Sequence, residues 1–326
     1  MAEEDQKNLH LPEVIVFGPP SVFKIYSLQF SSKFQMLKPW ESPLPLPQYL
    51  AENAQNTRVA LCSGICPLPA TVIAQLPSLS LIVSTSAGMN HIDLTECRRR
   101  GIAIANGATV FSVDVADLAV GLLIDVSRKI SAGNRYVRNG LWPEQGIYPL
   151  GFKLGGKKVG IVGLGSIGLE VAKRLEAFGC TLLYHSRKKN SSVSYIFHSN
   201  ILELAAASDV LVICCPLTEQ TRHMINRDVL LALGKEGLIV NIARGSVIDE
   251  KELVRCLQQR EIAGAGLDVF ENEPRVPTEL FELDNVVLSP HFAVFTEESF
   301  RDSYELVTGN LEAFFSNKPL LSPATF

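Results

Sequence analysis

The sequence predicts an α/β protein with two doubly wound parallel sheets, and three observations lead to this fold class. The chain has 326 residues, enough for two domains at roughly 150 residues each. Short β-branched apolar runs, typical of buried parallel strands, alternate with longer amphipathic segments. One long helical pattern divides these runs into two series, so each series predicts its own sheet.

The first series predicts an open parallel sheet. Each apolar run is followed by glycine, serine or asparagine, as expected where a strand ends in a turn. Helical patterns occupy 69–76 and 94–100, and three prolines within 40–47 predict a loop. The strands are expected at 14–17, 59–61, 81–83 and 102–104.

Residues 112–130 predict the long helix, with Ser112 as its N-cap, because apolar residues recur there at helical spacing. The second series then has six apolar runs, the size of a complete dinucleotide-binding unit. One amphipathic helix is expected after residue 296. The six strands are expected at 159–162, 181–184, 210–213, 238–241, 264–267 and 286–288.

Composition excludes several classes of protein. The 47% apolar and 20% charged residues exclude disorder and a collagen-like fibre. A balance of 30 Lys+Arg against 34 Asp+Glu gives −4, which provides no large positive field for nucleic acid or an anionic membrane. The seven cysteines contain no C-x-x-C pair, and no histidine cluster completes a zinc pattern, so no metal site and reduced structural thiols are predicted.

Two segments and the hydropathy predict a cytoplasmic location. The start, residues 1–5, is acidic, whereas secretory peptides are basic and transit peptides are poor in acidic residues. The last four residues do not match a peroxisomal address. No apolar run approaches the ~20 residues that cross a bilayer.

Residues 163–168 fit the pattern G-x-G-x-x-G. An expected strand precedes them and a helical pattern over 169–177 follows, which is the context of a dinucleotide-binding loop. Glycines there allow a tight turn and close backbone approach, and the helix N-terminus faces the pyrophosphate. A purely structural turn is the alternative. The predicted cofactor contacts are Gly163, Leu164, Gly165, Ser166, Ile167 and Gly168.

Ser186, Arg187 and Lys188 stand where an acidic residue would hold the ribose of NAD. A carboxylate there repels a 2′-phosphate, whereas a hydroxyl and two cations can bind one. The sequence therefore predicts a preference for NADP(H), with NAD(H) as a possible cofactor, against the alternative of a solvated basic loop.

Three further stretches follow the mid-chain glycine loop: 214–221, 241–245 and 266–274, with Pro290-His291 after them. Together with the glycine loop they resemble the D-isomer-specific 2-hydroxyacid dehydrogenase family, and within it the plant glyoxylate/hydroxypyruvate reductases. The resemblance covers nearly the whole chain. With the order of the motifs, it implies a Rossmann cofactor domain, 107–296, inserted into a flavodoxin-like substrate domain, 1–106 and 297–326.

The resemblance implies a catalytic triad of Arg244, Glu273 and His291. Reduction of a 2-keto acid needs a proton donor at the carbonyl oxygen, and imidazole suits that role. A carboxylate from Glu273 beside the ring would favour its protonated form. Arg244 offers a planar, permanently charged fork to the substrate carboxylate and the polarised carbonyl.

The resemblance also implies binding residues outside the triad. The backbone N–H groups of Ser86, Ala87 and Gly88 would bind the substrate carboxylate. His91, nearby, is interpreted as structural or as a support for the site. Asp268 would lie near the nicotinamide carboxamide. The remaining implied cofactor contacts are Cys215, Pro216, Thr221, Ile242 and Ala243.

Two departures from the family pattern leave the substrate open. Asp117 stands where glutamate is more usual, and Phe292 follows the histidine of the implied triad. Phe292 and Phe295 add aromatic bulk near the site, so aromatic keto acids stay open as substrates. The leading interpretation is an NADPH-dependent reductase that converts glyoxylate or hydroxypyruvate to glycolate or D-glycerate. The alternatives are a hydroxyphenylpyruvate reductase and a corepressor-like dinucleotide sensor. A homodimer that associates through 112–142 is expected from the family.

Overall fold

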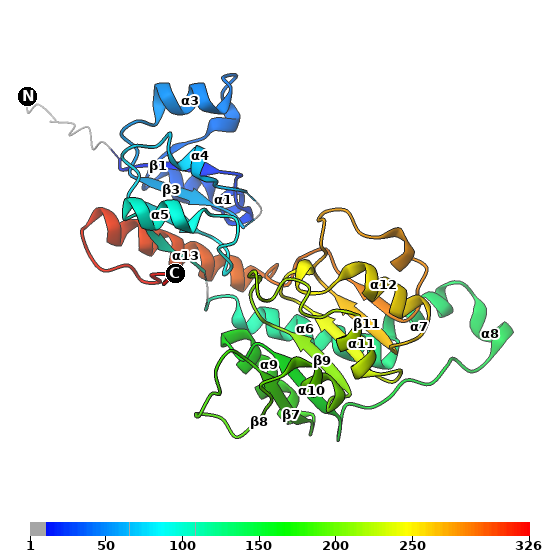
Figure 1. Cartoon of the computed structure of the whole chain (residues 1–326). Helices are drawn as coiled ribbons and strands as arrows, with labels where there is room; N and C mark the ends of the chain where they lie inside the picture. Colours follow the sequence, from blue (N-terminus) through cyan, green and yellow to red (C-terminus); the bar gives the residue numbers. More distant parts are fainter. Residues whose placement is uncertain (1–10, 65, 108) are drawn as a thin grey trace, which may run out of the picture. The chain divides into compact units, whose positions relative to one another are not determined.

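The computed structural model describes residues 11–64, 66–107 and 109–326, and the chain divides into two α/β units (Figure 1). Unit 1 comprises Met1–Val110 and Thr296–Phe326, and unit 2 comprises Phe111–Phe295. The boundaries expected from the sequence, 106/107 and 296/297, remain a prediction for the two domains. The acidic start at 1–5 lies outside the described residues.

Unit 1 contains a five-stranded parallel sheet in the order β2-β1-β3-β4-β5, the flavodoxin-like order. Apolar side chains cover both faces, as expected for a buried parallel sheet. The strands are β1 (Glu13–Phe17), β2 (Gln35–Leu37), β3 (Val59–Cys62), β4 (Leu81–Ser84) and β5 (Ala103–Ala105). The helices are α1 (Ser21–Ile25), α2 (Ser27–Ser31), α3 (Leu46–Asn53), α4 (Ala70–Ile73), α5 (Leu94–Arg100) and α13 (Glu297–Phe315).

Two details of unit 1 differ from the prediction. The edge strand β2 is only three residues long and not buried, so it lacks the apolar pattern by which the other strands are found. The expected loop at 40–47 was wrong at its end, because α3 begins at Leu46. Pro47 lies in the first turn of that helix, where the missing N–H would have no intrahelical partner.

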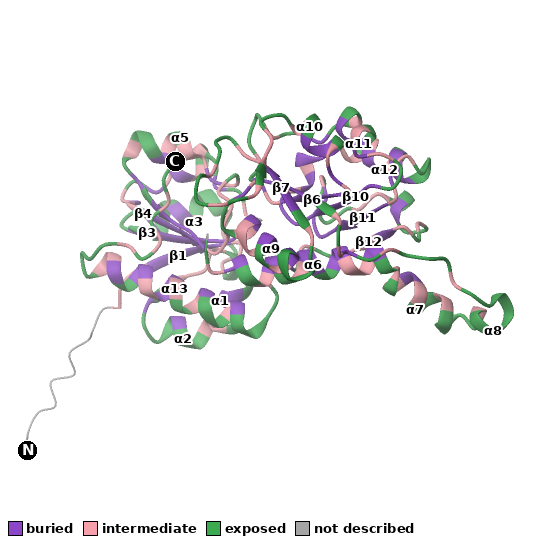
Figure 2. Cartoon of the chain, turned by 90° about the horizontal axis from the view of Figure 1, so that it is seen from below, coloured by how far each residue is buried: buried purple, intermediate pink, exposed green. Residues whose placement is uncertain are grey.

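Unit 2 contains a seven-stranded parallel sheet in the order β12-β11-β10-β9-β6-β7-β8. Figure 2 shows α6 and α9 on one side of these strands and α10, α11 and α12 on the other. The strands are β6 (Lys158–Val162), β7 (Thr181–His185), β8 (Ile196–Phe197), β9 (Val210–Ile213), β10 (Leu238–Asn241), β11 (Gly264–Leu267) and β12 (Val286–Leu288). The helices are α6 (Ser112–Arg128), α7 (Ile130–Arg138), α8 (Leu141–Gln145), α9 (Ser166–Ala177), α10 (Ile201–Ala206), α11 (Arg227–Leu233) and α12 (Glu250–Gln258).

The strand order of unit 2 is that of a Rossmann sheet, with β12 added at one edge. The order reverses between β6 and β9, and a dinucleotide binds at such a reversal, beside the carboxyl ends of the strands. All six expected strands form. The seventh, β8, was missed because two residues carry no periodic pattern.

The long helix ends earlier than predicted. Lys129 adopts the left-handed conformation, with φ of 57°, so α6 stops at Arg128 and α7 begins at Ile130. The Asp125 carboxylate accepts the Ser131 N–H at 2.7 Å and stabilises the start of α7. Ser112 was wrongly expected as the N-cap: it is the first helical residue, and the cap position is Phe111.

All seven cysteines are free thiols. Burial raises the pKa of Cys97 to about 11 and that of Cys215 to about 12, so both stay protonated at neutral pH. Among the described helices, none combines the length and apolar character needed to cross a bilayer.

Candidate active site

The glycine loop joins β6 to α9, and each of its three glycines suits its position for a different physical reason. Gly163 has a φ of 96°, and a Cβ there would lie 2.7 Å from the Cys215 backbone. At Gly168, a Cβ would lie 2.2 Å from the Gly163 carbonyl oxygen, so this glycine allows α9 to pack against the strand end. At Gly165, a Cβ would meet none of the described atoms within 4 Å. The open position suits a pyrophosphate that approaches the backbone closely.

The start of α9 supports the same assignment. No side chain caps this helix, whose cap position is Gly165. Its first N–H groups and the positive end of its dipole therefore remain for an anion. Leu164 is buried, Ser166 is exposed and Ile167 is half-buried at this turn. The residues present fit a bound dinucleotide phosphate.

The basic segment after β7 lies directly beside this loop. The Gly163 N–H donates to the His185 carbonyl at 2.8 Å, so Ser186 follows at the same sheet edge. The Ser186 hydroxyl donates to the Lys188 carbonyl and closes a tight turn. Arg187 and Lys188 are exposed, and within the described part of the chain neither forms an ion pair. Two available cations therefore flank the glycine loop.

The loop after β9 also reaches this edge. The Cys214 N–H donates to the Val162 carbonyl at 2.8 Å, and buried Cys215 packs against Gly163. The Thr221 hydroxyl donates to the Pro216 carbonyl at 2.7 Å and shapes the rest of the loop. Of these predicted cofactor residues, Cys215 thus lies against the glycine loop, and Pro216 and Thr221 follow it in the same loop.

The predicted acid–base pair is formed within unit 2. His291 Nδ1 donates to Glu273 Oε2 at 2.7 Å, with 38% and 30% of the two side chains exposed. The other carboxylate oxygen of Glu273 accepts the Phe270 N–H at 2.9 Å. Burial alone would raise the pKa of Glu273, but the hydrogen bonds from His291 and Phe270 and the Arg244 charge outweigh it and lower the pKa. Glu273 is therefore an ionised partner for the imidazole.

Asp268 fixes the turn that carries His291, a role the sequence analysis missed. Its side chain is 1% exposed and accepts the Ser289 hydroxyl at 2.7 Å and the Phe292 N–H at 3.0 Å. The Ala293 N–H is a third donor, at 3.3 Å. Burial raises the pKa of Asp268, although these bonds and His291 oppose the rise. The signal in the sequence was that Asp268 directly follows the apolar run at 264–267. Burial of a carboxylate there would cost free energy unless hydrogen-bond donors met it.

His291 itself has a φ of 51°, in the left-handed region that few residues other than glycine adopt. Its N–H donates to the Asp268 carbonyl at 2.7 Å. Backbone and side chain of Asp268 together hold the ring in this conformation. Such conformations cost about 1–3 kcal/mol and occur often at functional sites.

Arg244 leaves the end of β10 in a braced loop. The Asn241 side chain accepts the Ala243 N–H at 3.0 Å and donates to the Arg244 carbonyl at 3.1 Å. The guanidinium donates to the Ala243 carbonyl at 2.6 Å, and among the described residues no carboxylate lies within ion-pair distance of it. Burial lowers the pKa of Arg244 while Glu273 raises it. Most of its donors are therefore available to an anion, beside buried Ile242 and Ala243.

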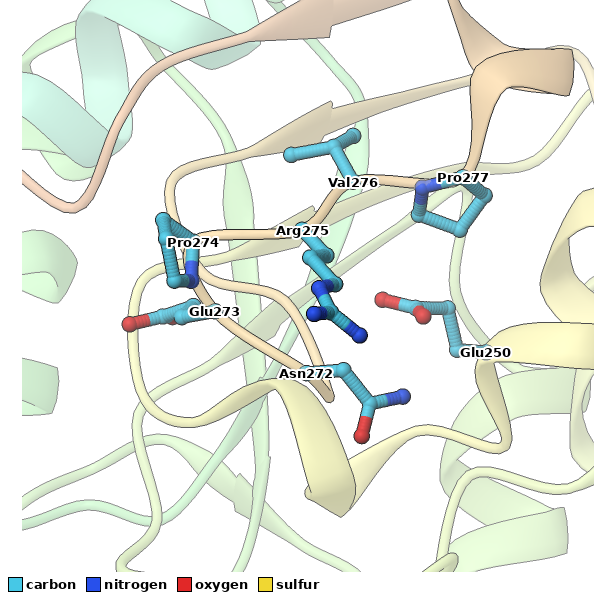
Figure 3. Close-up of a pocket in the computed structure, with 7 residues that line it drawn as sticks. All are labelled: Glu250, Asn272, Glu273, Pro274, Arg275, Val276 and Pro277. Carbon is cyan, nitrogen blue, oxygen red and sulfur yellow. The ribbon is translucent and has the colours of Figure 1, made fainter.

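Gly245 brings the Arg244 loop against the Glu273 loop. A Cβ at Gly245 would lie 1.9 Å from the Phe270 carbonyl carbon, so only glycine permits this contact. Beyond it, a pocket of about 680 Å³ has Glu273 in its lining, with Glu250 and Arg275 facing each other across it (Figure 3).

The predicted substrate loop, Ser86-Ala87-Gly88, lies in unit 1 after β4. The Ser86 hydroxyl donates to the Gly88 carbonyl at 3.0 Å, and Asn106 donates to the Ala87 carbonyl at 2.9 Å. His91 Nε2 lies 3.3 Å from the Ser84 hydroxyl and braces the same loop. The role of the loop in carboxylate binding remains a prediction.

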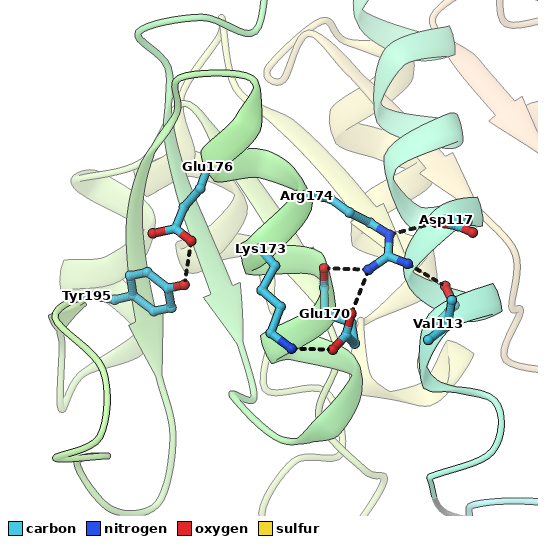
Figure 4. Close-up of polar contacts among 7 residues, drawn as sticks. All are labelled: Val113, Asp117, Glu170, Lys173, Arg174, Glu176 and Tyr195. Atoms are coloured by element: carbon cyan, nitrogen blue, oxygen red, sulfur yellow. Dashed lines mark hydrogen bonds and ion pairs between the residues drawn. The ribbon is translucent and has the colours of Figure 1, made fainter.

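Asp117 has a structural partner in unit 2. Arg174 Nε donates to its carboxylate at 2.6 Å, while Nη1 donates to Glu170 at 2.8 Å and Nη2 to the Val113 carbonyl at 3.3 Å (Figure 4). The shorter aspartate at this position therefore still joins α6 to α9.

A family model, curated relatives and solved structures all show similarity between this chain and 2-hydroxyacid dehydrogenases or keto-acid reductases. The family model described as the NAD binding domain of D-isomer specific 2-hydroxyacid dehydrogenase matches residues 120–293. A glyoxylate/hydroxypyruvate reductase of Arabidopsis thaliana is 51% identical over 96% of this chain and 97% of that protein. A hydroxyphenylpyruvate reductase of Plectranthus scutellarioides is 44% identical over 95% and 98%. The crystal structure of an NADPH-dependent glyoxylate/hydroxypyruvate reductase of Sinorhizobium meliloti, with NADP and malonate, superposes with a TM-score of 0.88 at 34% identity, covering 96% and 97%.

Proposed function

The chain belongs to the D-isomer-specific 2-hydroxyacid dehydrogenase family, and on that premise we propose that it reduces glyoxylate or hydroxypyruvate with NADPH. The products are glycolate or D-glycerate. The observation that carries the proposal is the 2.7 Å hydrogen bond between His291 and Glu273. The same loop cluster holds Arg244, which forms no ion pair within the described residues.

His291 donates the proton that the carbonyl oxygen needs as it becomes a hydroxyl. Glu273 accepts the Nδ1 hydrogen bond and so orients the ring, which leaves Nε2 for the substrate. NADPH, when bound, supplies the hydride to the carbonyl carbon. Each turnover therefore consumes one proton through His291.

Arg244 binds and polarises the keto acid. Its guanidinium is planar and keeps most of its donors, which suits a carboxylate and the adjacent carbonyl oxygen. The N–H groups of Ser86, Ala87 and Gly88 are proposed to bind the substrate carboxylate as well, following the family pattern.

NADP(H) is proposed as the preferred cofactor and NAD(H) as a weaker one. Ser186, Arg187 and Lys188 support this preference, because they follow β7 beside the glycine loop and present a hydroxyl and two exposed cations. The relative from Sinorhizobium meliloti is NADPH-dependent.

Reduction of 4-hydroxyphenylpyruvate is the second candidate. Phe292 and Phe295, next to the catalytic histidine, are 41% and 54% exposed and offer aromatic contacts. The relative from Plectranthus scutellarioides is named for that activity.

One matrix of assays tests the function. Purified protein is mixed with NADH or NADPH and with glyoxylate, hydroxypyruvate, pyruvate or 4-hydroxyphenylpyruvate, while nicotinamide absorbance is followed. The highest kcat/KM is expected with NADPH and glyoxylate or hydroxypyruvate. A preference for 4-hydroxyphenylpyruvate supports the second candidate, and binding of NADPH without turnover on any keto acid supports a dinucleotide sensor.

A homodimer is proposed as the working assembly. The helices α7 and α8 expose the large apolar side chains of Ile130, Val137 and Trp142, which a partner subunit would cover. Light scattering after gel filtration tests the assembly: twice the 35.7 kDa chain mass is expected, and a monomer contradicts it.

A further inference from the structure

Glu271, two residues before the catalytic carboxylate, is attached to a different loop of unit 2. Its side chain is 17% exposed, and Oε1 accepts hydrogen bonds from His223 Nε2 at 2.8 Å and from Arg222 Nη2 at 3.1 Å. The Arg222 side chain is mostly exposed, where an ion pair contributes little. The shorter contact to half-buried His223 is therefore the main attachment.

His223 ties this attachment to the loop after β9. That loop also carries Pro216 and Thr221, the proposed cofactor contacts. His223 has a φ of 51°, and its N–H donates to the Ser246 carbonyl at 2.9 Å, in the loop after β10. The histidine is thus held by its backbone before its side chain meets Glu271.

The Glu271 backbone is held from a third direction. Its N–H donates at 2.9 Å to the Glu250 carboxylate, at the start of α12. The Cβ that Gly245 lacks would lie 2.3 Å from the same nitrogen, so the Arg244 loop packs directly on this peptide. Three loops, from the ends of β9, β10 and β11, therefore meet at Glu271.

We propose that Glu271 is a positioning residue for the reduction: it joins the cofactor-side loop to the loop of Glu273 and so holds that carboxylate against His291. The proposal rests on the proposed function, because the position of Glu273 matters to turnover only if this pair carries the reaction. The Phe270 N–H donates to Glu273, so the segment 270–273 forms one short loop closed by its own hydrogen bond. A displacement of about 1 Å in such a group lowers a rate by ~100-fold.

The first test compares Glu271→Ala with Glu282→Ala as a matched control. Glu282 is exposed in the same unit, and in the described residues it has no recorded hydrogen bond or ion pair. With hydroxypyruvate, Glu271→Ala is expected to lower kcat by ~10- to 100-fold and to change the KM for NADPH by less than about threefold. The isotope effect on kcat with 4-deuterated NADPH should rise, because the chemical step becomes slower. Wild-type kcat in Glu271→Ala would overturn the proposal, even if its Tm falls.

A second test covers the case in which Glu271→Ala does not fold. Glu271→Gln is nearly isosteric, and His223→Asn places a residue that tolerates the positive φ at this position. The two single variants and the double variant together form a double-mutant cycle. If the two side chains act through one contact, the double variant loses no more kcat than the more damaged single variant. Fully additive losses overturn the proposal.

Amide hydrogen exchange separates the failure of this inference from failure of the proposed function. If the wild-type protein turns over no keto acid, the function is refuted, and the attachment is then judged on structure alone. Faster exchange at 270–275 in Glu271→Gln than in Glu282→Gln supports the attachment. Equal exchange in the two variants overturns it.

Discussion

The carboxylate of Asp268 accepts the N–H of Phe292, the residue immediately after His291, at 3.0 Å. A buried acid thus holds the backbone next to the proposed proton donor. Within the described residues, its carboxylate forms no hydrogen bond with the imidazole ring itself. The position of the ring depends on this bond and on the Asp268 carbonyl, which accepts the His291 N–H.

Asp268→Asn should therefore damage both stability and turnover. The amide can accept through only one atom, so at least one of the three donors at Ser289, Phe292 and Ala293 loses its partner. An unsatisfied buried donor costs about 1–3 kcal/mol of unfolding free energy. Denaturant unfolding and kcat are the measurements. An unchanged midpoint with wild-type kcat would show that the turn does not need the carboxylate.

His291→Ala and Arg244→Ala should each abolish most turnover while the protein stays folded. Loss of a general acid costs ~10²- to 10⁴-fold in rate. Arg244→Lys keeps the charge but loses the planar fork, so its KM for the keto acid should rise as well. Steady-state kinetics measure both effects, with circular dichroism as the control for folding. Activity near wild type in His291→Ala would refute the proposed acid.

Acid should destabilise the protein through Glu273. Its pKa lies below the ordinary 4.5 in the folded state, because the hydrogen bonds from His291 and Phe270 outweigh the effect of burial. The folded state thus binds fewer protons than the unfolded chain, so the contribution of Glu273 to stability is complete above pH 4.5 and is lost as pH falls through the lower folded value. Denaturant unfolding at a series of acidic pH values measures it. Glu273→Gln should show a shallower decline below pH 4.5 than wild type, and identical slopes would contradict the assignment.

Gly245→Ala should separate the Arg244 loop from the Glu273 loop. The new methyl group would lie 1.9 Å from the carbonyl carbon of Phe270, so backbone must move. Overpacking of this kind costs about 1–3 kcal/mol of unfolding free energy, so Tm should fall. The displaced triad should also lower kcat. Thermal unfolding and kinetics test this. A variant with full kcat would mean that the two loops need not touch.

Much of the fold could be predicted because most buried strands leave a short but continuous apolar run in the sequence. Short elements, such as β2 and β8, leave none, and the break at Lys129 depends on one residue's dihedral angles. In the candidate site, the resemblance to a known family implied the triad of Arg244, Glu273 and His291. The roles of Asp268 and Glu271 in holding those residues arise from contacts between loops far apart in sequence, which no local pattern records.

The segment after β7 makes the cofactor preference testable. In Ser186→Asp/Arg187→Ala, a carboxylate replaces a hydroxyl and a cation is lost beside the glycine loop, so a 2′-phosphate should be repelled while a ribose 2′-hydroxyl gains an acceptor. A change of only 1.4 kcal/mol is tenfold in affinity, so the ratio of kcat/KM for NADPH over NADH should fall at least about tenfold. Lys189→Ala is the matched control, because it removes a neighbouring exposed cation outside the predicted contact set. If Lys189→Ala lowers the ratio as much as the double variant does, the segment acts through general charge. If neither changes the ratio, the phosphate is recognised elsewhere.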